Sequence, residues 1–251
     1  MWSPSSDPAA APRLLDAGEA ALVVEFGAQV SPRINDRVLA LDAALATLQP
    51  PGVRECVPTY RSLMIHYDPL VLDRDDLAAT VRALTQDLGT DAPAPARALW
   101  TIPCCYDPVF GEDLPQIAAS LGMRPDQVAA LHASARYRLY MYGFAPGFCY
   151  LGGLPETLCR ISRRAMPRPP HPPNVVMLAG GLASIATVSM PTGWFLLGRT
   201  PERMFALDRD PLVLLNVGDE LTFEPIDRTT FEALEARAAR GERVARRERT
   251  L

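Results

Sequence analysis

Residues 143–155 read Gly-Phe-Ala-Pro-Gly-Phe-Cys-Tyr-Leu-Gly-Gly-Leu-Pro. The four glycines of this stretch allow positive φ angles or a close approach of the backbone to another group. Its two prolines stiffen the chain, and the rings of Phe144, Phe148 and Tyr150 add flat apolar surface. The combination predicts a shaped loop at the edge of a pocket. The alternative is a pair of tight turns between barrel strands, with the aromatic rings filling the core.

The sequence around this loop is rich in short strands. Arg136–Tyr142 alternates as a strand that leads into the loop, and two short helices are expected at Leu114–Leu121 and Pro125–Ala133. Many short strands separated by Gly and Pro indicate a small β-barrel, here over residues 98–228. The other predicted strands are Leu99–Pro103, Val175–Ala179, Ser184–Val188, Trp194–Gly198 and Glu220–Ile226.

Residues 13–90 have a different pattern, in which amphipathic helices alternate with strands. Ser31-Pro32 is a helix start signal, with Ser at the cap and Pro at the first helical position. The predicted order is strand, helix, strand, strand, helix, which suggests a small α/β domain of the ferredoxin-like kind and an α+β fold overall. The segments behind this order are Ala21–Phe26, Ser31–Leu48, Val53–Pro58, Ser62–Tyr67 and Asp73–Leu88.

Three further segments lie outside these two domains. Residues 1–12, rich in Pro, Ala and Ser, are expected to form a disordered lead. Residues 91–97 are a Pro- and Ala-rich linker between the domains. Residues 229–251 are an arginine-rich tail, expected to be helical or partly disordered.

Composition excludes several classes of function. The chain has 251 residues, 48% of them hydrophobic and 22% charged, and a net charge of −4, as an ordinary globular protein has. We therefore expect no nucleic-acid partner, and no apolar run is long enough to span a membrane. The N-terminus lacks the basic and apolar segments of a signal peptide, so the expected location is the cytoplasm.

Two residue types narrow the chemistry further. The five cysteines show no zinc-type spacing, and no metal site is predicted. The chain contains no lysine, so every basic side chain is an arginine. This excludes a Schiff-base lysine and the phosphate-gripping lysine of a nucleotide-binding loop.

Several segments together resemble the allophanate hydrolase subunit 1 family. The most specific are Leu131-His132, Tyr137–Met141 and Gly143–Pro155. The family includes the 5-oxoprolinase B subunit, the KipI-type inhibitors of histidine kinases and part of the carboxyltransferase region of urea carboxylase. The resemblance implies a small N-terminal α/β domain followed by a cyclophilin-like β-barrel. Further matches, in family order, are Pro167-Arg168, Ala179-Gly180-Gly181, Gly193-Trp194 and Gly198–Pro201.

The chain departs from the family pattern in one region. Members usually have Val-Pro-Ala-Gly-Ser and then Gly-Gly-Gln-Thr-Gly-Ile-Tyr-Pro. Here the turn Gly and Ser are replaced by Asn174 and Val175, the Gln by Leu182 and the Tyr by Ala186. Polar groups suited to substrate binding have thus largely given way to apolar ones, so the chain is identified as a divergent member.

The resemblance implies a subunit of an ATP-dependent amidohydrolase complex similar to 5-oxoprolinase or allophanate hydrolase. Its substrate would be a cyclic or small amide, and ATP, with Mg, would be the cofactor. A companion of the subunit 2, or 5-oxoprolinase C, type is also implied. The alternative is a KipI-like, non-catalytic inhibitor that binds a histidine kinase, which the loss of polar groups also fits.

The chemistry of ring opening suggests which side chains take part. The oxygen of a cyclic amide must become a leaving group, and the site must hold the resulting anion. Arginine is the remaining cation here, and its planar fork suits phosphate or carboxylate. We expect Arg168 and Arg199 to contact the anion, although for each the alternative is a surface ion pair.

His132 is the predicted catalytic residue, because a histidine pKa near neutrality suits a general acid or base. The alternative for it is a helix-end residue that caps carbonyl groups. Gly180-Gly181 is either a backbone contact to the substrate or a barrel corner, and Trp194 either stacks on a ligand or lies in the core. The predicted substrate-binding residues are Phe144, Pro146, Gly147, Phe148, Tyr150, Gly152, Gly153, Arg168, Gly180, Gly181, Trp194 and Arg199.

Overall fold

The computed structural model describes residues 11–88 and 97–248, and the chain divides into two compact units between residues 96 and 97. The dividing point lies within residues 91–97, the predicted linker. The predicted linker, except for Arg97, lies outside the described residues, as do residues 1–10 of the predicted lead.

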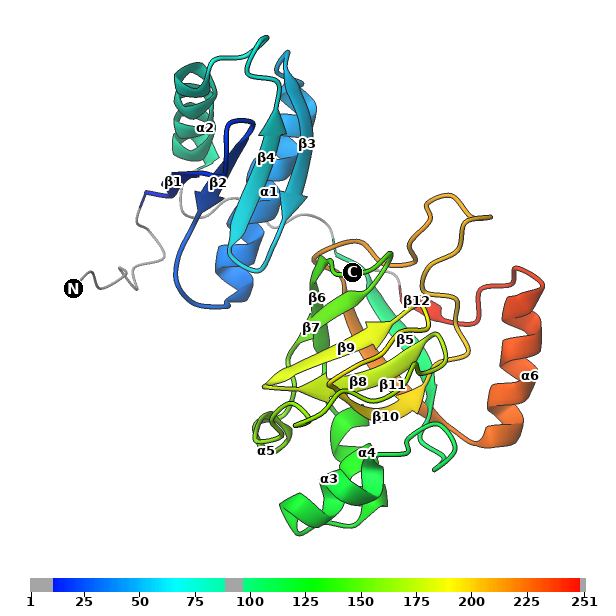
Figure 1. Ribbon diagram of the computed structural model, residues 1–251. Helices are drawn as coiled ribbons and strands as arrows, with labels where there is room; N and C mark the ends of the chain where they lie inside the picture. Colours follow the sequence, from blue (N-terminus) through cyan, green and yellow to red (C-terminus); the bar gives the residue numbers. More distant parts are fainter. Residues whose placement is uncertain (1–10, 89–96, 249–251) are drawn as a thin grey trace. The chain divides into compact units, whose positions relative to one another are not determined.

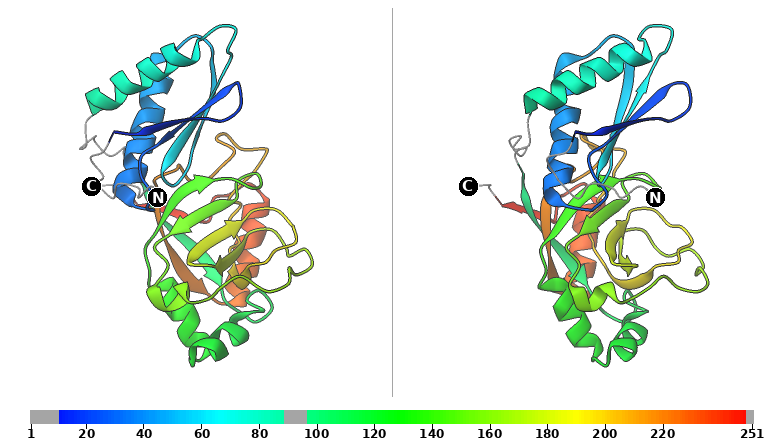
Figure 2. Two further views of the ribbon diagram at one scale, coloured as in Figure 1. Left: turned by 60° about the vertical axis from the view of Figure 1, so that its left-hand side comes forward. Right: turned by 90° about the vertical axis from the view of Figure 1, so that its left-hand side faces the viewer.

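The first unit is a four-stranded antiparallel sheet with two helices on one face (Figures 1 and 2). Its strand order is β1-β2-β4-β3. Apolar side chains from the sheet and from both helices form one buried core, which includes Leu22, Leu41, Ile65 and Leu77. The elements are β1 (Arg13–Asp16), β2 (Ala21–Glu25), α1 (Pro32–Leu48), β3 (Val53–Pro58), β4 (Ser62–Tyr67) and α2 (Arg74–Leu88).

The predicted order of strand, helix, strand, strand, helix is present from β2 to α2. A ferredoxin-like unit would add a strand after the second helix. In the described part of this unit the fourth strand is instead β1, which comes before β2 and pairs with it. The mixed α and β composition is therefore as expected, whereas the ferredoxin-like assignment is not confirmed.

The second unit is a closed β-barrel (Figure 1), as the sequence predicts. Its strands follow the order β10-β8-β9-β7-β6-β11-β5, and pairing of Arg199 with Cys105 joins β10 to β5 and closes the barrel. Neighbouring strands are antiparallel except β5 and β11, which are parallel. The strands are β5 (Leu99–Cys105), β6 (Tyr137–Tyr142), β7 (Cys149–Gly152), β8 (Val175–Ala179), β9 (Leu182–Ala186), β10 (Phe195–Arg199) and β11 (Glu220–Ile226).

Strand β8 is buried on both faces. Val176 and Leu178 belong to the main barrel core, whereas the alternate residues Val175, Met177 and Ala179 belong to a second cluster. Because successive side chains of a strand point to opposite faces, the second cluster lies on the outer surface of the barrel wall. The long apolar run of β8 therefore serves two cores. The outer cluster also contains Phe148, Ala186, Trp194 and Leu196.

Helices α3 (Leu114–Leu121) and α4 (Pro125–Ala133) pack against each other beside the barrel, and α5 (Glu156–Cys159) follows β7. No helix in the described parts of the chain is both long and apolar enough to cross a membrane.

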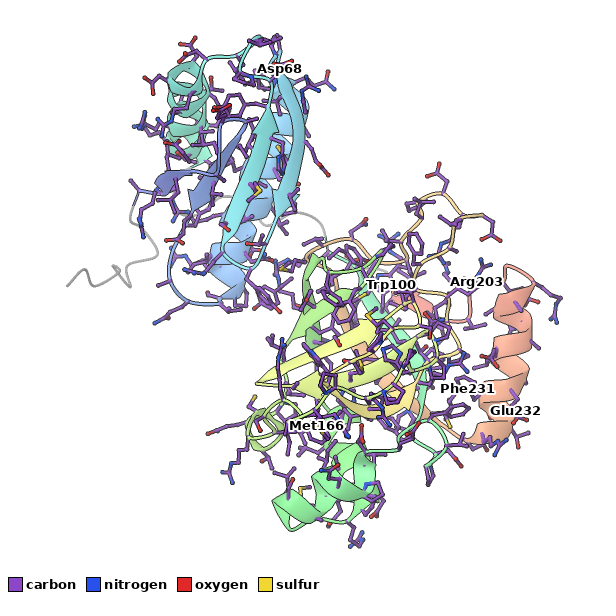
Figure 3. All side chains as sticks on the ribbon, in the orientation of Figure 1. Asp68, Trp100, Met166, Arg203, Phe231 and Glu232 are labelled. Atoms are coloured by element: carbon purple, nitrogen blue, oxygen red, sulfur yellow. The ribbon has the colours of Figure 1, made fainter. Side chains whose placement is uncertain are left out.

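The described part of the C-terminal segment, which was predicted as a helical or partly disordered tail, contains a helix and a short strand. Helix α6 (Arg228–Ala239) places Phe231 toward the barrel, where it is 1% exposed, and Glu232 toward solvent (Figure 3). A short strand, β12 (Arg246–Glu248), then pairs with β5. The buried carboxylate of Glu202 accepts hydrogen bonds from the backbone amides of Val244 and Ala245, both at 2.7 Å. This segment is therefore part of the second unit.

Candidate functional site

The glycine- and aromatic-rich loop connects β6 to β7 and is tied down by its own hydrogen bonds. The amide of Gly143 donates to the carbonyl of Phe148 at 3.3 Å. The amide of Phe148 donates to the carbonyl of Ala145 at 3.0 Å. The hydroxyl of Thr187 donates to the carbonyl of Pro146 at 2.5 Å. Phe144 has a φ of 69°, a left-handed conformation that a bulky residue rarely adopts. The loop is therefore held in one shape.

The glycines of the loop are required by packing inside the protein. A Cβ atom on Gly147 would lie 2.6 Å from the Cβ of Phe205, and one on Gly152 would lie 2.4 Å from the ring of Tyr140. Gly153 has a φ of 101°, and a Cβ atom added to it would lie 2.4 Å from the carbonyl oxygen of Arg136. These three predicted substrate contacts thus have structural neighbours at the positions where a ligand was expected.

Four aromatic rings gather on the outer surface of the barrel wall, and we call them the aromatic face: Phe144, Phe148, Tyr150 and Trp194. The ring of Phe148 lies 5.8, 4.9 and 6.2 Å from those of Phe144, Tyr150 and Trp194. Phe148 and Trp194 are buried, at 3% and 6% exposed, whereas Phe144 is 80% exposed. Phe144 and the half-buried Tyr150 are therefore the rings that offer surface to a ligand, supported from beneath by the other two.

Arg163 adds a positive charge to the aromatic face. Its guanidinium carbon lies 5.7 Å from the ring centroid of Trp194, a cation–π distance. Among the described residues no carboxylate lies within ion-pair distance of it. Sequence reasoning did not single out Arg163, because the matched family segment begins at Pro167. The available signal was the unusual run Arg160-Ile-Ser-Arg-Arg.

Three of the departures from the family pattern, Val175, Leu182 and Ala186, lie on this same face. In the register of the sheet, Ser184 of β9 stands between Tyr150 of β7 and Met177 of β8. Since side chains alternate along a strand, Leu182 and Ala186 share the face of Ser184. The hydroxyl of Ser184 is fully buried and has no hydrogen-bond partner among the described residues. The chain therefore presents an apolar floor beneath the aromatic rings, with one unpaired hydroxyl in it.

Arg168, a predicted anion contact, is already paired. Its guanidinium donates to Asp113 at 2.6 Å and forms a second, shorter contact with Glu112. Asp113 is buried and also accepts from Arg164 at 2.9 Å and from the amide of Leu196 at 2.7 Å. Arg168 therefore forms an ion pair within the protein, which was the alternative to an anion contact. Through Asp113 it links its own loop to α3 and β10.

Arg199 is occupied in the same way. Its guanidinium pairs with Glu235 of α6 at 2.9 Å and lies 5.3 Å from the ring centroid of Phe231, while its Nε donates to the carbonyl of Pro173 at 2.9 Å. Arg199 therefore secures α6 to the barrel, and the expectation of an anion contact is not supported.

Gly180 and Gly181 form the two-residue turn between β8 and β9, in which Ala179 pairs with Leu182. Their φ angles of 56° and 80° are both positive, as a type I′ hairpin turn requires. The amide of Gly180 donates to the carbonyl of Ile161 at 2.8 Å. The pair is thus a barrel corner, with the Gly180 amide already used inside the protein.

His132, the predicted acid or base, lies in the core of the second unit. It is 0% exposed and its ring packs 4.7 Å from that of Phe223 and 5.1 Å from that of Tyr137. A hydrogen bond of 2.8 Å joins its Nδ1 to the hydroxyl of Tyr106. Burial lowers the pKa of His132 to about 3, so the ring is neutral at pH 7. A neutral ring without access to solvent or ligand does not fit a catalytic role, and His132 is excluded from the proposed site.

The described residues do not provide the phosphate site that a bound ATP requires at Arg168 or Arg199, because both guanidinium groups are held by carboxylates. No group of three or more His, Cys, Asp or Glu side chains is placed to hold a metal ion within residues 11–88 and 97–248. No step of the chemistry is therefore assigned to a nucleotide bound at these arginines.

The family of the carboxyltransferase domain, subdomain C and D, matches residues 12–215. The chain belongs to this family. It is 30% identical over 230 residues to the B subunit of 5-oxoprolinase from Bacillus subtilis strain 168, a match that covers 86% of the chain and 93% of that protein. This result confirms the predicted relationship and its divergence.

Two solved structures extend the comparison. The crystal structure of TTHA0988 superposes with a TM-score of 0.73 at 37% identity, covering 82% of this chain and 40% of that one. The chain is thus similar to less than half of that longer polypeptide. The urea amidolyase of K. lactis gives a TM-score of 0.74 at 17% identity, covering 97% of this chain and 17% of that one, which shows a shared fold.

Proposed function

We propose that the chain is one component of an ATP-dependent amidohydrolase complex that opens 5-oxoproline to glutamate. The supporting observation is the 30% identity to the B subunit of a 5-oxoprolinase along 93% of that protein's length. The companion would be of the 5-oxoprolinase C type. In this proposal the companion supplies the ATP site, since the arginines first expected to hold phosphate are paired within this chain.

The aromatic face is the part of this chain that would contact the substrate. 5-Oxoproline is a small ring with an amide and a carboxylate. The ring would pack on Phe144 and Tyr150, and the carboxylate would pair with the guanidinium of Arg163, which lies over the ring of Trp194. In this proposal the chain binds and orients 5-oxoproline. The apolar floor at Leu182 and Ala186 excludes water from one side of the lactam ring.

The test is an assay of ATP turnover by the purified pair of subunits. We expect phosphate release that depends on 5-oxoproline, on this chain and on the companion together. Arg163→Gln should raise the KM for 5-oxoproline by ~10- to 100-fold, since a hydrogen-bonded charge contributes about 1.5–3 kcal/mol. The matched control is Arg124→Gln, which removes an exposed arginine paired with Asp126 at 2.7 Å outside the aromatic face and should leave the KM unchanged. A stable complex with no 5-oxoproline-dependent turnover would refute the proposal.

A second candidate function is a KipI-like inhibitor that binds a histidine kinase. It is favoured by the burial of His132 and by the internal pairing of Arg168 and Arg199, which leave no catalytic side chain at the predicted positions. The exposed ring of Phe144 would then be a protein contact. Inhibition of kinase autophosphorylation that is lost in Phe144→Ala, combined with absent 5-oxoproline turnover, would select this function over the first.

A further inference from the structure

A hollow whose lining includes no residue of the aromatic face lies between α3, the segment after α5 and the start of β10. It has a volume of about 280 Å³. Its polar lining residues are Arg160, Gln116, Ser120 and Ser162. None of its lining residues is acidic.

Arg160 is the charged group of this hollow, and it is free to bind. The segment Arg160–Arg168 contains four arginines and no acidic residue. Arg164 and Arg168 are paired with Asp113, whereas no described carboxylate lies within 4.0 Å of the guanidinium of Arg160. An unpaired guanidinium beside the side-chain amide of Gln116 and the hydroxyl of Ser162 is a donor set that suits an oxyanion, whereas the hydroxyl of Ser120 already donates within the protein.

The backbone beside Arg160 is fixed, so that the hollow is preformed. The amide of Ile161 donates to the carbonyl of Leu158 at 3.1 Å, and the carbonyl of Ile161 accepts from the amide of Gly180 at 2.8 Å. The segment is therefore anchored both to α5 and to the β8–β9 turn. On the opposite wall, Ser120 is oriented by a 2.7 Å hydrogen bond from its hydroxyl to the carbonyl of Ile117.

The remaining walls are apolar. Leu121 and Phe195 are half-buried and offer the apolar surface, with the buried Ile117 and Ile161 behind them. The guanidinium carbon of Arg164 lies 5.4 Å from the centroid of the Phe195 ring and helps to hold Phe195 in place, while its charge is paired with Asp113. Apolar walls favour an anion that carries a hydrocarbon part over a bare inorganic ion, because burial of apolar surface adds to the ionic contact.

We propose that this hollow is a binding site for a small organic carboxylate, with Arg160 pairing the carboxylate group and the half-buried side chains of Leu121 and Phe195 contacting its hydrocarbon part. The site is separate from the aromatic face and does not depend on the proposed hydrolase activity. The chain would then bind two ligands, a small organic acid in this hollow and the substrate at the aromatic face.

The test uses the full chain without a companion and cyclopentanecarboxylate as the probe, followed by shifts of backbone amide signals in nuclear magnetic resonance. We expect saturable shifts at Gln116, Ser120 and Ser162. The neutral isostere cyclopentanecarboxamide should bind at least ~10-fold more weakly, because it lacks the charge. Inorganic phosphate, tested at the same ionic strength, should also bind more weakly, because it gains nothing from the apolar walls.

Two variants three residues apart decide the assignment. Arg160→Gln should abolish the probe-dependent shifts at Gln116, Ser120 and Ser162, whereas Arg163→Gln, with the same change of charge, should leave these shifts in place. Arg160 is exposed, so its replacement is not expected to unfold the chain, and unchanged amide signals without the probe would verify this. Absence of binding to the wild-type chain, equal binding of the carboxamide, stronger binding of phosphate, or retained shifts in Arg160→Gln would each overturn the proposal.

Discussion

The guanidinium of Arg168 donates to the carboxylate of Asp113 at 2.6 Å, across 55 positions of sequence. Asp113 is 5% exposed and sits just before α3. The same carboxylate receives Arg164 and the amide of Leu196. One buried acid therefore joins the arginine-rich segment, α3 and β10.

Asp113→Asn should destabilise the second unit. The substitution leaves the guanidinium groups of Arg164 and Arg168 without their buried counter-charge, and breaking a buried pair typically costs about 3–5 kcal/mol. Urea unfolding followed by circular dichroism gives the change in free energy. The comparison variant is Glu112→Gln, since Glu112 is about half exposed and pairs with Arg168 alone, and such exposed pairs contribute about 1 kcal/mol or less. Equal losses in the two variants would contradict the central role of Asp113.

The glycines provide a graded test of backbone conformation. Gly147→Ala combines a φ of 68° with a clash at 2.6 Å, so it should cost more than the ~1–2 kcal/mol of left-handed strain alone. Gly180→Ala, with a φ of 56° and open space around the new Cβ, should cost only that strain. Gly193→Ala meets no atom within 4 Å and has no positive φ, so it should be neutral or slightly stabilising. Melting temperatures should follow this order, and a Gly147→Ala protein as stable as Gly193→Ala would be inconsistent with the packing of Phe205.

Burial of His132 predicts a dependence of stability on pH. The folded-state pKa is lowered from 6.5 to about 3, so below pH 6.5 the unfolded chain binds a proton at this position that the folded protein does not. Stability is therefore full above pH 6.5 and declines as the pH falls toward 3. The limiting slope is about 1.4 kcal/mol per pH unit for one proton.

The contribution of His132 to this slope is measured by comparing the wild-type protein with His132→Gln. The free energy of unfolding of each is determined from pH 6.5 to 5, where most carboxylates remain ionised. The variant is expected to be less stable at pH 7 because the packing against Phe223 is lost, and to show a shallower decline on acidification. Parallel stability curves for the two proteins would show that residue 132 does not titrate in the way its burial requires.

The barrel and the family were accessible from sequence because both rest on local pattern. The strand at Val175–Ala179 is one apolar run, and the loop at 143–155 is a contiguous motif. The partners of Arg168 and Arg199 were not accessible in this way, since Asp113 and Glu235 lie far along the chain and only the closed barrel brings them near.

His132 illustrates a second limit. A histidine next to apolar residues in a short helix reads equally as a helix cap or as an acid or base, and the deciding fact is the pair of rings from β6 and β11 that enclose it. The strand Arg246–Glu248 was missed for the opposite reason. Its three residues are all charged, and its pairing with β5 is made by backbone groups that carry no side-chain signal.

Glu202 should control the docking of this C-terminal strand. Its side chain is 1% exposed, and its Oε2 accepts both the Val244 and Ala245 amides, so Glu202→Ala leaves two buried donors unpaired. Hydrogen bonds to a charged group contribute about 1.5–3 kcal/mol each, and we expect a net loss of a few kcal/mol.

Because Arg243 and Arg247 lie over the ring of Trp100 at 5.5 and 5.7 Å, release of the strand also uncovers this indole. Faster amide hydrogen exchange at residues 244–248, with a red shift of tryptophan emission, would report the release. The matched variant Glu224→Gln removes the exposed pair with Arg246 at 2.8 Å and should change neither signal appreciably. If Glu202→Ala and Glu224→Gln loosen the strand equally, then surface charge, rather than the buried carboxylate, holds the strand in place.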